Sequence, residues 1–370
     1  MDRKGWIECS IGEACKEIFA GGDVSKTAFS KEKTESCPIP IFSNGVENNG
    51  LYGYTDTPRV VEPCVTISGR GTIGHCVLHV EPFYPIIRLI SAIPKDTIDI
   101  RYFYYALSSI KFKSTGVAIP QLTVPAVKSY RFIYPVEIEE QQRIVAELDL
   151  LSGIVEKKNA QLRTLDELAS TIFYEMFGDP VSNDRNWPTA RMNDVAPQKV
   201  YAGAISAKDG KYWLLNLDMV ESQTGRVVEK ALFSPAEIRN STTTFNEDNV
   251  LYSKLRPYLN KVVLPDEPGY CTSELVPLLP KKGVLNRIYL TYLLRSKFFV
   301  DYINARVAGA KMPRVTMSDF REFDVILPPI AFQESFAARI IAIDKQKKII
   351  NDSIPPAKDL LLSRMDKYFC

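Results

Sequence analysis

The chain contains an internal repeat, and this feature constrains its fold more than any other. Residues 116–141 read Gly-Val-Ala-Ile-Pro-Gln-Leu-Thr, then Phe-Ile-Tyr-Pro and Ile-Glu-Glu-Gln; residues 309–333 repeat this order as Gly-Ala-Lys-Met-Pro-Arg-Val-Thr, Val-Ile-Leu-Pro and Ile-Ala-Phe-Gln. The segments Trp6–Ala14 and Trp187–Val195 match more weakly. Self-similarity of this kind predicts duplicated structural units. We therefore expect two related globular units, each followed by a helix.

The two globular units, about residues 6–137 and 187–329, mix short β-type runs with helical patches. The β-type runs are Cys64–Ile67, Cys76–Val80, Asn249–Tyr252 and Lys261–Leu264, and the helical patches are Arg101–Ile110 and Asn286–Asn304. Such mixing within one unit predicts an α+β class.

The segments that follow the globular units have helical periodicity. Between Glu139 and Phe177 there is no proline, and the only interior glycine is Gly153. Apolar residues recur at spacings of three and four, interrupted by Lys158: Ile144, Leu148, Leu151, Val155, Leu162, Leu165, Leu168, Ile172 and Met176. The tail repeats the pattern at Phe336, Ile340, Ile343, Ile350 and Ile354, and after Pro355 and Pro356 at Leu361 and Met365. Two such seams predict an antiparallel coiled coil and approximate two-fold symmetry.

Composition limits the remaining possibilities. The net charge of +2 does not indicate a polyanion partner by itself, so a nucleic-acid surface has to be a local patch. The seven cysteines include no C-x-x-C pair, which predicts reduced thiols and no zinc ribbon. No run approaches eighteen apolar residues, and the first ten residues lack the apolar core of a signal peptide. We expect a cytoplasmic protein with no membrane partner.

Several phrases in the linker regions resemble the specificity subunits of type I restriction-modification systems. Tyr134–Val145, Ile172–Pro180 and Asn186-Trp187 look like that family's central conserved region, and Leu327–Gln333 looks like its distal one. The resemblance covers nearly the whole chain in layout and is weak inside the globular units. It implies target-recognition domains at 1–137 and 179–329, a central conserved helix at 138–178 and a distal one at 330–370.

The resemblance also implies function and partners. A specificity subunit reads a bipartite target in double-stranded DNA and has no catalytic site of its own. It works with two methyltransferase subunits docked along the helices and two translocase-nuclease subunits. The chain itself is expected to bind no cofactor, whereas S-adenosylmethionine, ATP and Mg are expected on the partner subunits.

Candidate DNA contacts lie in turns and in basic stretches that occupy equivalent places in the two halves. Gln121 and Arg314 are aligned in the repeat, and their side chains suit bidentate contacts to adenine and guanine. Cations near the repeated segments can meet phosphates; the alternative is a solvated basic loop. The candidates are Arg70, Thr72, Lys111, Lys113, Gln121, Lys128, Lys254, Arg256, Tyr258, Lys261, Arg306, Lys311 and Arg314.

Other motifs have weaker support. Gly69–Gly74 matches G-x-G-x-x-G, but the following residues alternate like a strand, so a tight β-turn is favoured over a dinucleotide site. His75, Cys76 and His79 lack further metal ligands nearby. No P-loop, H-E-x-x-H, G-x-S-x-G or N/D-P-P-Y/F motif is present. Glu139–Gln141 could recognise a partner, but the simpler account is an acidic helix N-terminus favoured by the macrodipole, and the two are compatible.

Two other functions remain open from the sequence. One is a coiled-coil scaffold whose globular ends bind proteins rather than DNA. The other is the specificity module of a fused DNA methyltransferase or nuclease system, which requires catalytic motifs that this sequence lacks. Charge reversal at Lys254, Arg256 and Arg314 would separate the scaffold from a DNA-binding protein.

Overall fold

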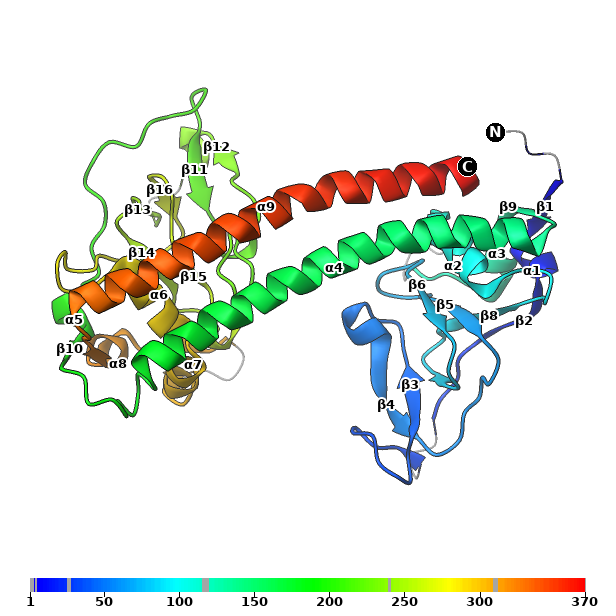
Figure 1. Cartoon of the computed structure of the whole chain (residues 1–370), viewed down its shortest axis with the longest axis horizontal. Coiled ribbons are helices and arrows are strands. Elements are labelled where there is room, and N and C mark those ends of the chain that lie inside the picture. The colour runs from blue at the N-terminus through cyan, green and yellow to red at the C-terminus, as the bar shows by residue number, and fades with distance from the viewer. Residues whose placement is uncertain are drawn as a thin grey trace. The chain divides into compact units, whose positions relative to one another are not determined.

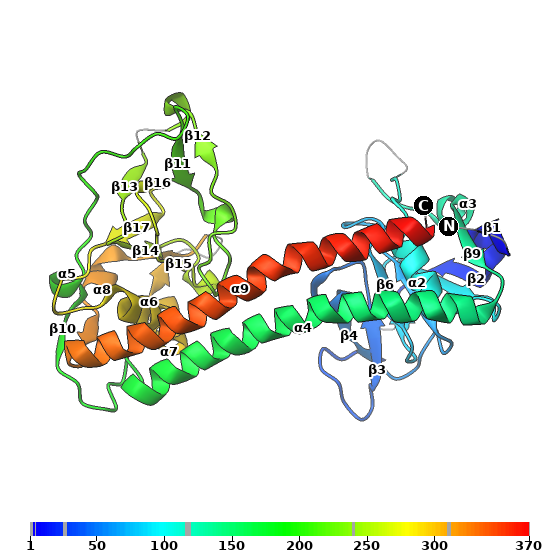
Figure 2. The same cartoon turned by 45° about the horizontal axis from the view of Figure 1, so that its top comes forward.

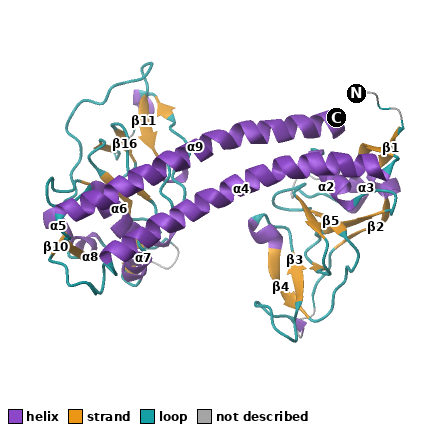
Figure 3. Cartoon of the chain, viewed as in Figure 1, coloured by secondary structure: helices purple, strands orange, loops and turns teal. Residues whose placement is uncertain are grey.

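The computed structural model describes residues 3, 5–24, 28–114, 120–238, 241–308 and 312–369. The chain divides into two compact units (Figure 1). Unit 1 comprises Met1–Lys158 and Ser353–Cys370, and unit 2 comprises Asn159–Asp352. Each unit mixes helices with strands (Figure 3), which confirms the predicted α+β class. No helix in the described ranges is long and apolar enough to cross a membrane.

Unit 1 is built on a four-stranded antiparallel sheet with the order β2-β8-β5-β6. A smaller sheet has the order β4-β3-β7, and β1 pairs with β9. The strands are β1 (Trp6–Ser10), β2 (Cys15–Ala20), β3 (Ile39–Phe42), β4 (Leu51–Thr55), β5 (Cys64–Ile67), β6 (Cys76–His79), β7 (Tyr84–Pro85), β8 (Ile90–Pro94) and β9 (Arg131–Pro135). The helices are α1 (Ile11–Ala14), η2 (Glu47–Gly50), α2 (Ile100–Ser109) and α3 (Val124–Ser129).

Unit 2 contains a three-stranded sheet, β15-β14-β17, a four-stranded sheet, β12-β11-β16-β13, and the pairs β10-β20 and β18-β19. The strands are β10 (Thr189–Arg191), β11 (Tyr212–Leu215), β12 (Leu232–Phe233), β13 (Thr243–Phe245), β14 (Val250–Ser253), β15 (Val262–Val263), β16 (Gly269–Cys271), β17 (Leu275–Leu278), β18 (Val307–Ala308), β19 (Arg314–Val315) and β20 (Asp324–Ile326). The helices are α5 (Met192–Val195), η3 (Leu217–Met219), η4 (Pro235–Glu237), η5 (Pro257–Leu259), α6 (Arg287–Arg295), α7 (Lys297–Asn304) and α8 (Met317–Arg321).

The predicted strands and helices are present, with one change. The helical patch at 286–304 is two helices, because Ser296 leaves the helical conformation at ψ 141°. Its hydroxyl then accepts a hydrogen bond from the backbone N–H of Phe299 at 3.2 Å and starts α7.

The two long helices, α4 (Ile138–Phe177) and α9 (Ile330–Phe369), each contribute a segment to both units. Within unit 1, Glu147 pairs with Arg364 at 3.1 Å and Lys158 donates to Ser353 at 2.7 Å. Within unit 2, the distance from Lys347 Nζ to Asp166 Oδ1 is 2.5 Å. In unit 1 the later residue of α4, Lys158, pairs with the earlier residue of α9, Ser353. The two helix segments therefore run antiparallel there, side by side as in Figures 1 and 2.

The predicted seam is correct near the start of α4 and wrong at Leu168, whereas Leu165, Ile172 and Met176 are partly buried and pack against the core of unit 2. Ile144 and Leu148 are fully buried, but Leu168 is 45% exposed. Ala169, Phe173 and Phe177 are buried in its place, four residues apart. A straight α-helix drifts relative to a 3.5-residue repeat, so the buried stripe shifts by one position along a helix of this length. α9 continues through Pro355 and Pro356.

A buried glutamine at the start of each long helix demonstrates the duplication. Gln141 Nε2 donates to the carbonyls of Thr97 and Pro135 at 3.0 and 2.9 Å, and its Oε1 accepts from the N–H of Asp99 at 2.7 Å. Gln141 is fully buried, so partner recognition at the surface is the wrong interpretation for this residue.

Gln333 repeats this arrangement in unit 2. Its Nε2 donates to Val284 and Pro328 at 3.1 and 2.7 Å, and its Oε1 accepts from the N–H of Asn286 at 2.9 Å. Asp99 and Asn286 are the N-caps of α2 and α6. Each glutamine therefore fixes its long helix to the equivalent cap and strand end of its own unit, which supports the pseudo-symmetry.

Candidate nucleic-acid interface

Each unit has a turn between two antiparallel strands that is hydrogen-bonded to the repeated segment. In unit 1 the turn 68–75 joins β5 to β6, and the N–H of Leu122 donates to the carbonyl of Gly69 at 2.8 Å. In unit 2 the turn 254–261 joins β14 to β15, and the N–H of Val315 donates to the carbonyl of Lys254 at 2.8 Å. We call the turn and its bound repeat segment the turn edge: 68–75 with 120–122, and 254–261 with 313–315.

At the turn edge of unit 1, two sequence candidates contact each other. Arg70 Nη2 donates to Gln121 Oε1 at 3.2 Å, although 51 positions separate them. The side chain of Asn44 holds the turn, since its Oδ1 accepts from the N–H groups of Gly69 and Arg70 at 2.7 and 3.3 Å and its Nδ2 donates to Ile87 at 2.6 Å. Arg70 Nε is buried, with no hydrogen-bond partner among the described residues.

The glycine-rich sequence at this edge has the geometry of a turn. Gly71 and Gly74 have φ of +68° and +83°, which side chains rarely adopt. A strand, β6, follows the turn, whereas a dinucleotide-binding fingerprint has to open a helix.

The remaining candidates of unit 1 are exposed. Thr72 lies in the turn. Lys111 and Lys113 flank Phe112, whose ring lies 4.9 Å from that of Tyr130 and against Gly74. Lys128 lies on α3, where its Cβ faces Gly12 of α1.

At the turn edge of unit 2, Arg314 pairs with a residue that sequence reasoning missed. Arg314 Nε and Nη2 both donate to Glu274 Oε1, at 3.3 and 3.1 Å. The N–H of Arg256 donates to Pro313 at 2.8 Å, and the N–H of Lys254 donates to the carbonyl of Glu274 at 3.0 Å. Backbone hydrogen bonds thus hold Lys254 and Arg256 next to the Arg314–Glu274 pair, and these four residues carry three positive charges and one negative charge.

The backbone of this turn is unusual. Arg256 and Asn260 both have φ of 50°, in the left-handed region that non-glycine residues rarely occupy. Asn260 is held by its Nδ2, which donates to the carbonyl of Arg295 at 2.9 Å. Between them Tyr258 is 48% exposed, and its ring is available to a ligand.

Three further candidates of unit 2 differ in availability. Lys261 Nζ donates to the carbonyl of Leu217 at 2.6 Å, and burial lowers the pKa of Lys261, so its ammonium serves the fold. Arg306 stacks on the ring of Tyr302 at 3.7 Å and donates to its carbonyl. Lys311 lies outside the described residues.

The residues missed from the sequence, Asn44 and Glu274, lie 26 and 40 positions from the arginines whose geometry they control. Neither lies in the repeat, so no local pattern marks them. In the described ranges, no group of three or more His, Cys, Asp or Glu is arranged to hold a metal ion.

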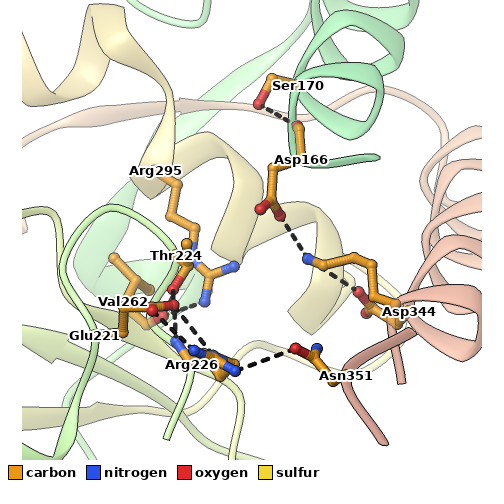
Figure 4. A network of polar contacts seen from close by, with 10 residues as sticks. Asp166, Ser170, Glu221, Thr224, Arg226, Val262, Arg295, Asp344 and Asn351 are labelled. Carbon is orange, nitrogen blue, oxygen red and sulfur yellow. Dashed lines mark hydrogen bonds and ion pairs between the residues drawn. The ribbon is translucent and has the colours of Figure 1, made fainter. Parts of the chain in front are cut away.

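A second polar cluster in unit 2 joins its globular part to both long helices (Figure 4). Arg226 pairs with Glu221 at 2.9 Å and donates to Asn351 of α9 at 3.4 Å. The pKa of Glu221 is lowered chiefly by its hydrogen bond from Arg226. The loop 221–226 is therefore tied to α9 by charge-assisted contacts.

The same cluster borders a cavity of about 840 Å³. Arg295 of α6 lines it and donates to the carbonyl of Val262, and burial lowers the pKa of Arg295. Asp166 and Asp344 line it as well and pair with Lys347. Acidic side chains thus neutralise most of the cations, and the cluster holds the loop 221–226 against α4 and α9 within unit 2.

Comparison with known proteins now identifies the class. The family model described as the type I restriction-modification DNA specificity domain matches residues 4–164 and 201–355. The chain belongs to this family, whose members are the DNA-recognition components of their systems and are not catalytic.

Individual relatives agree with the family. The chain is 37% identical over 155 residues to a Mycoplasma pneumoniae protein named as a type I specificity subunit, covering 41% of this chain and 46% of that protein. A second M. pneumoniae relative is matched over 40% of its length, so the aligned regions span less than half of these two proteins. The MjaIX specificity subunit of Methanocaldococcus jannaschii is 22% identical over 335 residues, 81% of this chain and 76% of that protein.

Among solved structures, the S subunit of a type I restriction-modification system from M. genitalium has a TM-score of 0.60 at 15% identity. The match covers 97% of this chain and 96% of that chain. At this identity the likeness concerns the fold alone.

Proposed function

We propose that this chain reads a bipartite sequence in double-stranded DNA, with one turn edge for each half-site. The observation that carries the proposal is that the two edges share a backbone frame, whereas the side chains they present differ. Gln121 and Arg314 occupy the same place in the repeat and offer different hydrogen-bonding groups to a base. A duplicated backbone arrangement that carries different side chains suits recognition of two unlike half-sites at a fixed separation.

The partners follow from the family. We assign target recognition to 1–137 and 179–329, and spacing and docking to the helices at 138–178 and 330–370. Two methyltransferase subunits would dock on the outer faces of the helices, where Leu150 and Ile349 are 67% and 70% exposed. Two translocase-nuclease subunits would complete the cleaving complex. S-adenosylmethionine, ATP and Mg belong to these partners, and the complex works in the cytoplasm.

The test is to express the chain with a cognate methyltransferase subunit and map methylated bases across the host genome. We expect one split motif with an unspecified spacer. Binding of the purified complex to that motif should weaken steeply with salt, since phosphate contacts release counterions.

A triple variant, Lys254→Glu with Arg256→Glu and Arg314→Glu, separates DNA binding from a protein scaffold. DNA binding predicts loss of affinity and of methylation. Unchanged affinity for DNA would contradict the proposal and favour the scaffold.

A further inference from the structure

We propose that Arg314 reads a guanine in the half-site bound by unit 2, and that Glu274 is the positioning residue that orients it. The inference rests on the proposed function and adds to it a base identity and a residue outside the sequence candidates.

The hydrogen bonds of the guanidinium carry the argument. Nε and Nη2 donate to Glu274 Oε1 along one edge of the group. No acceptor for Nη1 occurs among the described residues. The end of the guanidinium, with one N–H from Nη1 and one from Nη2, therefore remains for a ligand. That fork matches the O6 and N7 acceptors of guanine in the major groove.

The hydrogen bonds and burial of the Glu274 carboxylate indicate that it does not contact a base itself. Its Oε1 accepts both hydrogen bonds from Arg314, and its Oε2 is buried without a hydrogen-bond partner in the described part of the chain. The carboxylate thus acts through Arg314. It restrains a long side chain before binding, which lowers the conformational entropy lost when the base contact forms.

The backbone of Arg314 is fixed as well. Arg314 and Leu255 form a β-bridge, and the neighbouring N–H groups of Val315 and Arg256 bond across it at 2.8 Å each. An arginine paired with a carboxylate attracts phosphate less than a free cation does but keeps its directional donors. Lys254 and Arg256 have no ion-pair partner in the described part of unit 2 and suit the phosphates, which leaves base reading to Arg314.

The experiment uses the complex of the full chain with its methyltransferase subunit and measures methylation motifs and the Kd for duplexes varied one base pair at a time. Arg314→Lys keeps the charge and removes the fork. We expect it to reduce the preference for one guanine of the unit 2 half-site by about tenfold to a hundredfold. The other half-site, read by unit 1, is the internal control and should not change.

Glu274→Gln tests the positioning role, with an expected loss of about threefold to tenfold at the same guanine. The double variant should lose no more than Arg314→Lys alone, because Glu274 acts through Arg314; additive losses would assign Glu274 a separate role and overturn this part. Arg185→Lys is the matched control, since Arg185 is exposed and its guanidinium donates to the carbonyl of Glu175.

The outcomes separate the two proposals. If the wild-type complex shows no sequence preference, the proposed function fails. If it reads a split motif but Arg314→Lys changes no guanine, or lowers affinity equally for all duplexes, Arg314 contacts phosphate and the inference is wrong.

Discussion

Units 1 and 2 share the backbone arrangement of the turn edge and differ in the side chains that the edge carries. In unit 1 the turn edge uses glycines at positive φ, and the amide of Asn44 holds it. In unit 2 the edge uses Arg256 and Asn260 in the left-handed region. The N-caps of α2 and α6 and the hydrogen bonds of the buried glutamines correspond in both units. The difference teaches that duplication preserved what supports the edge, while the edge itself was free to change.

The largest expected effect tests the shared frame. Gln141→Leu and Gln333→Leu keep the side-chain volume but leave one N–H and two carbonyls without their partner in each unit. We expect each change to lower the free energy of unfolding by about 4 kcal/mol. Urea unfolding, monitored through hydrogen exchange in each unit, measures this change in the free energy of unfolding.

The neighbouring exposed Gln142→Leu is the control and should cost less than about 0.5 kcal/mol. If the two buried glutamines differed by more than about 2 kcal/mol, the equivalence of the frames would not extend to their energetics.

The second prediction concerns a feature that distinguishes the two units, since both histidines of the chain lie in unit 1. His79 is buried against the rings of Phe42 and Phe83, at 4.5 and 4.2 Å, and its Nε2 bonds to Thr66. Burial lowers the pKa of His79 to about 4. In the unfolded chain the pKa is about 6.5, so the unfolded state takes up the proton first as the pH falls.

The stabilising contribution of neutral His79 is therefore complete above pH 6.5 and is lost as the pH falls toward 4, by about 3 kcal/mol in all. His79→Gln should flatten the pH dependence of unfolding of unit 1 in this window. Carboxylates titrate in both units, so the measurement is the difference in slope between wild type and variant. Equal slopes would show that His79 is not held neutral by burial.

The sequence predicts features that are local or repeated. The strands at Cys64–Ile67 and Cys76–His79, the helix at α2 and the long helices follow from periodicity, which is a property of neighbouring residues. The pairings Arg70 with Gln121 and Arg314 with Glu274 span 51 and 40 positions and depend on how strands are brought together. Gln141 recurs in the repeat, but its acidic neighbours concealed its burial.

The last prediction contrasts a large and a small effect within α4, where sequence and structure disagree. Leu148 is fully buried and Leu168 is 45% exposed, although both belong to the seam predicted from spacing. Leu148→Ala should cost about 3 kcal/mol of unfolding free energy in unit 1, because it leaves a cavity in a packed core. Leu168→Ala should cost less than about 0.5 kcal/mol in unit 2, because water already covers much of the side chain. Equal costs would mean that Leu168 is buried, as the predicted seam requires. Unequal costs mean that Phe173 and Phe177 face the core of unit 2 in the second half of the helix, as the structure has them.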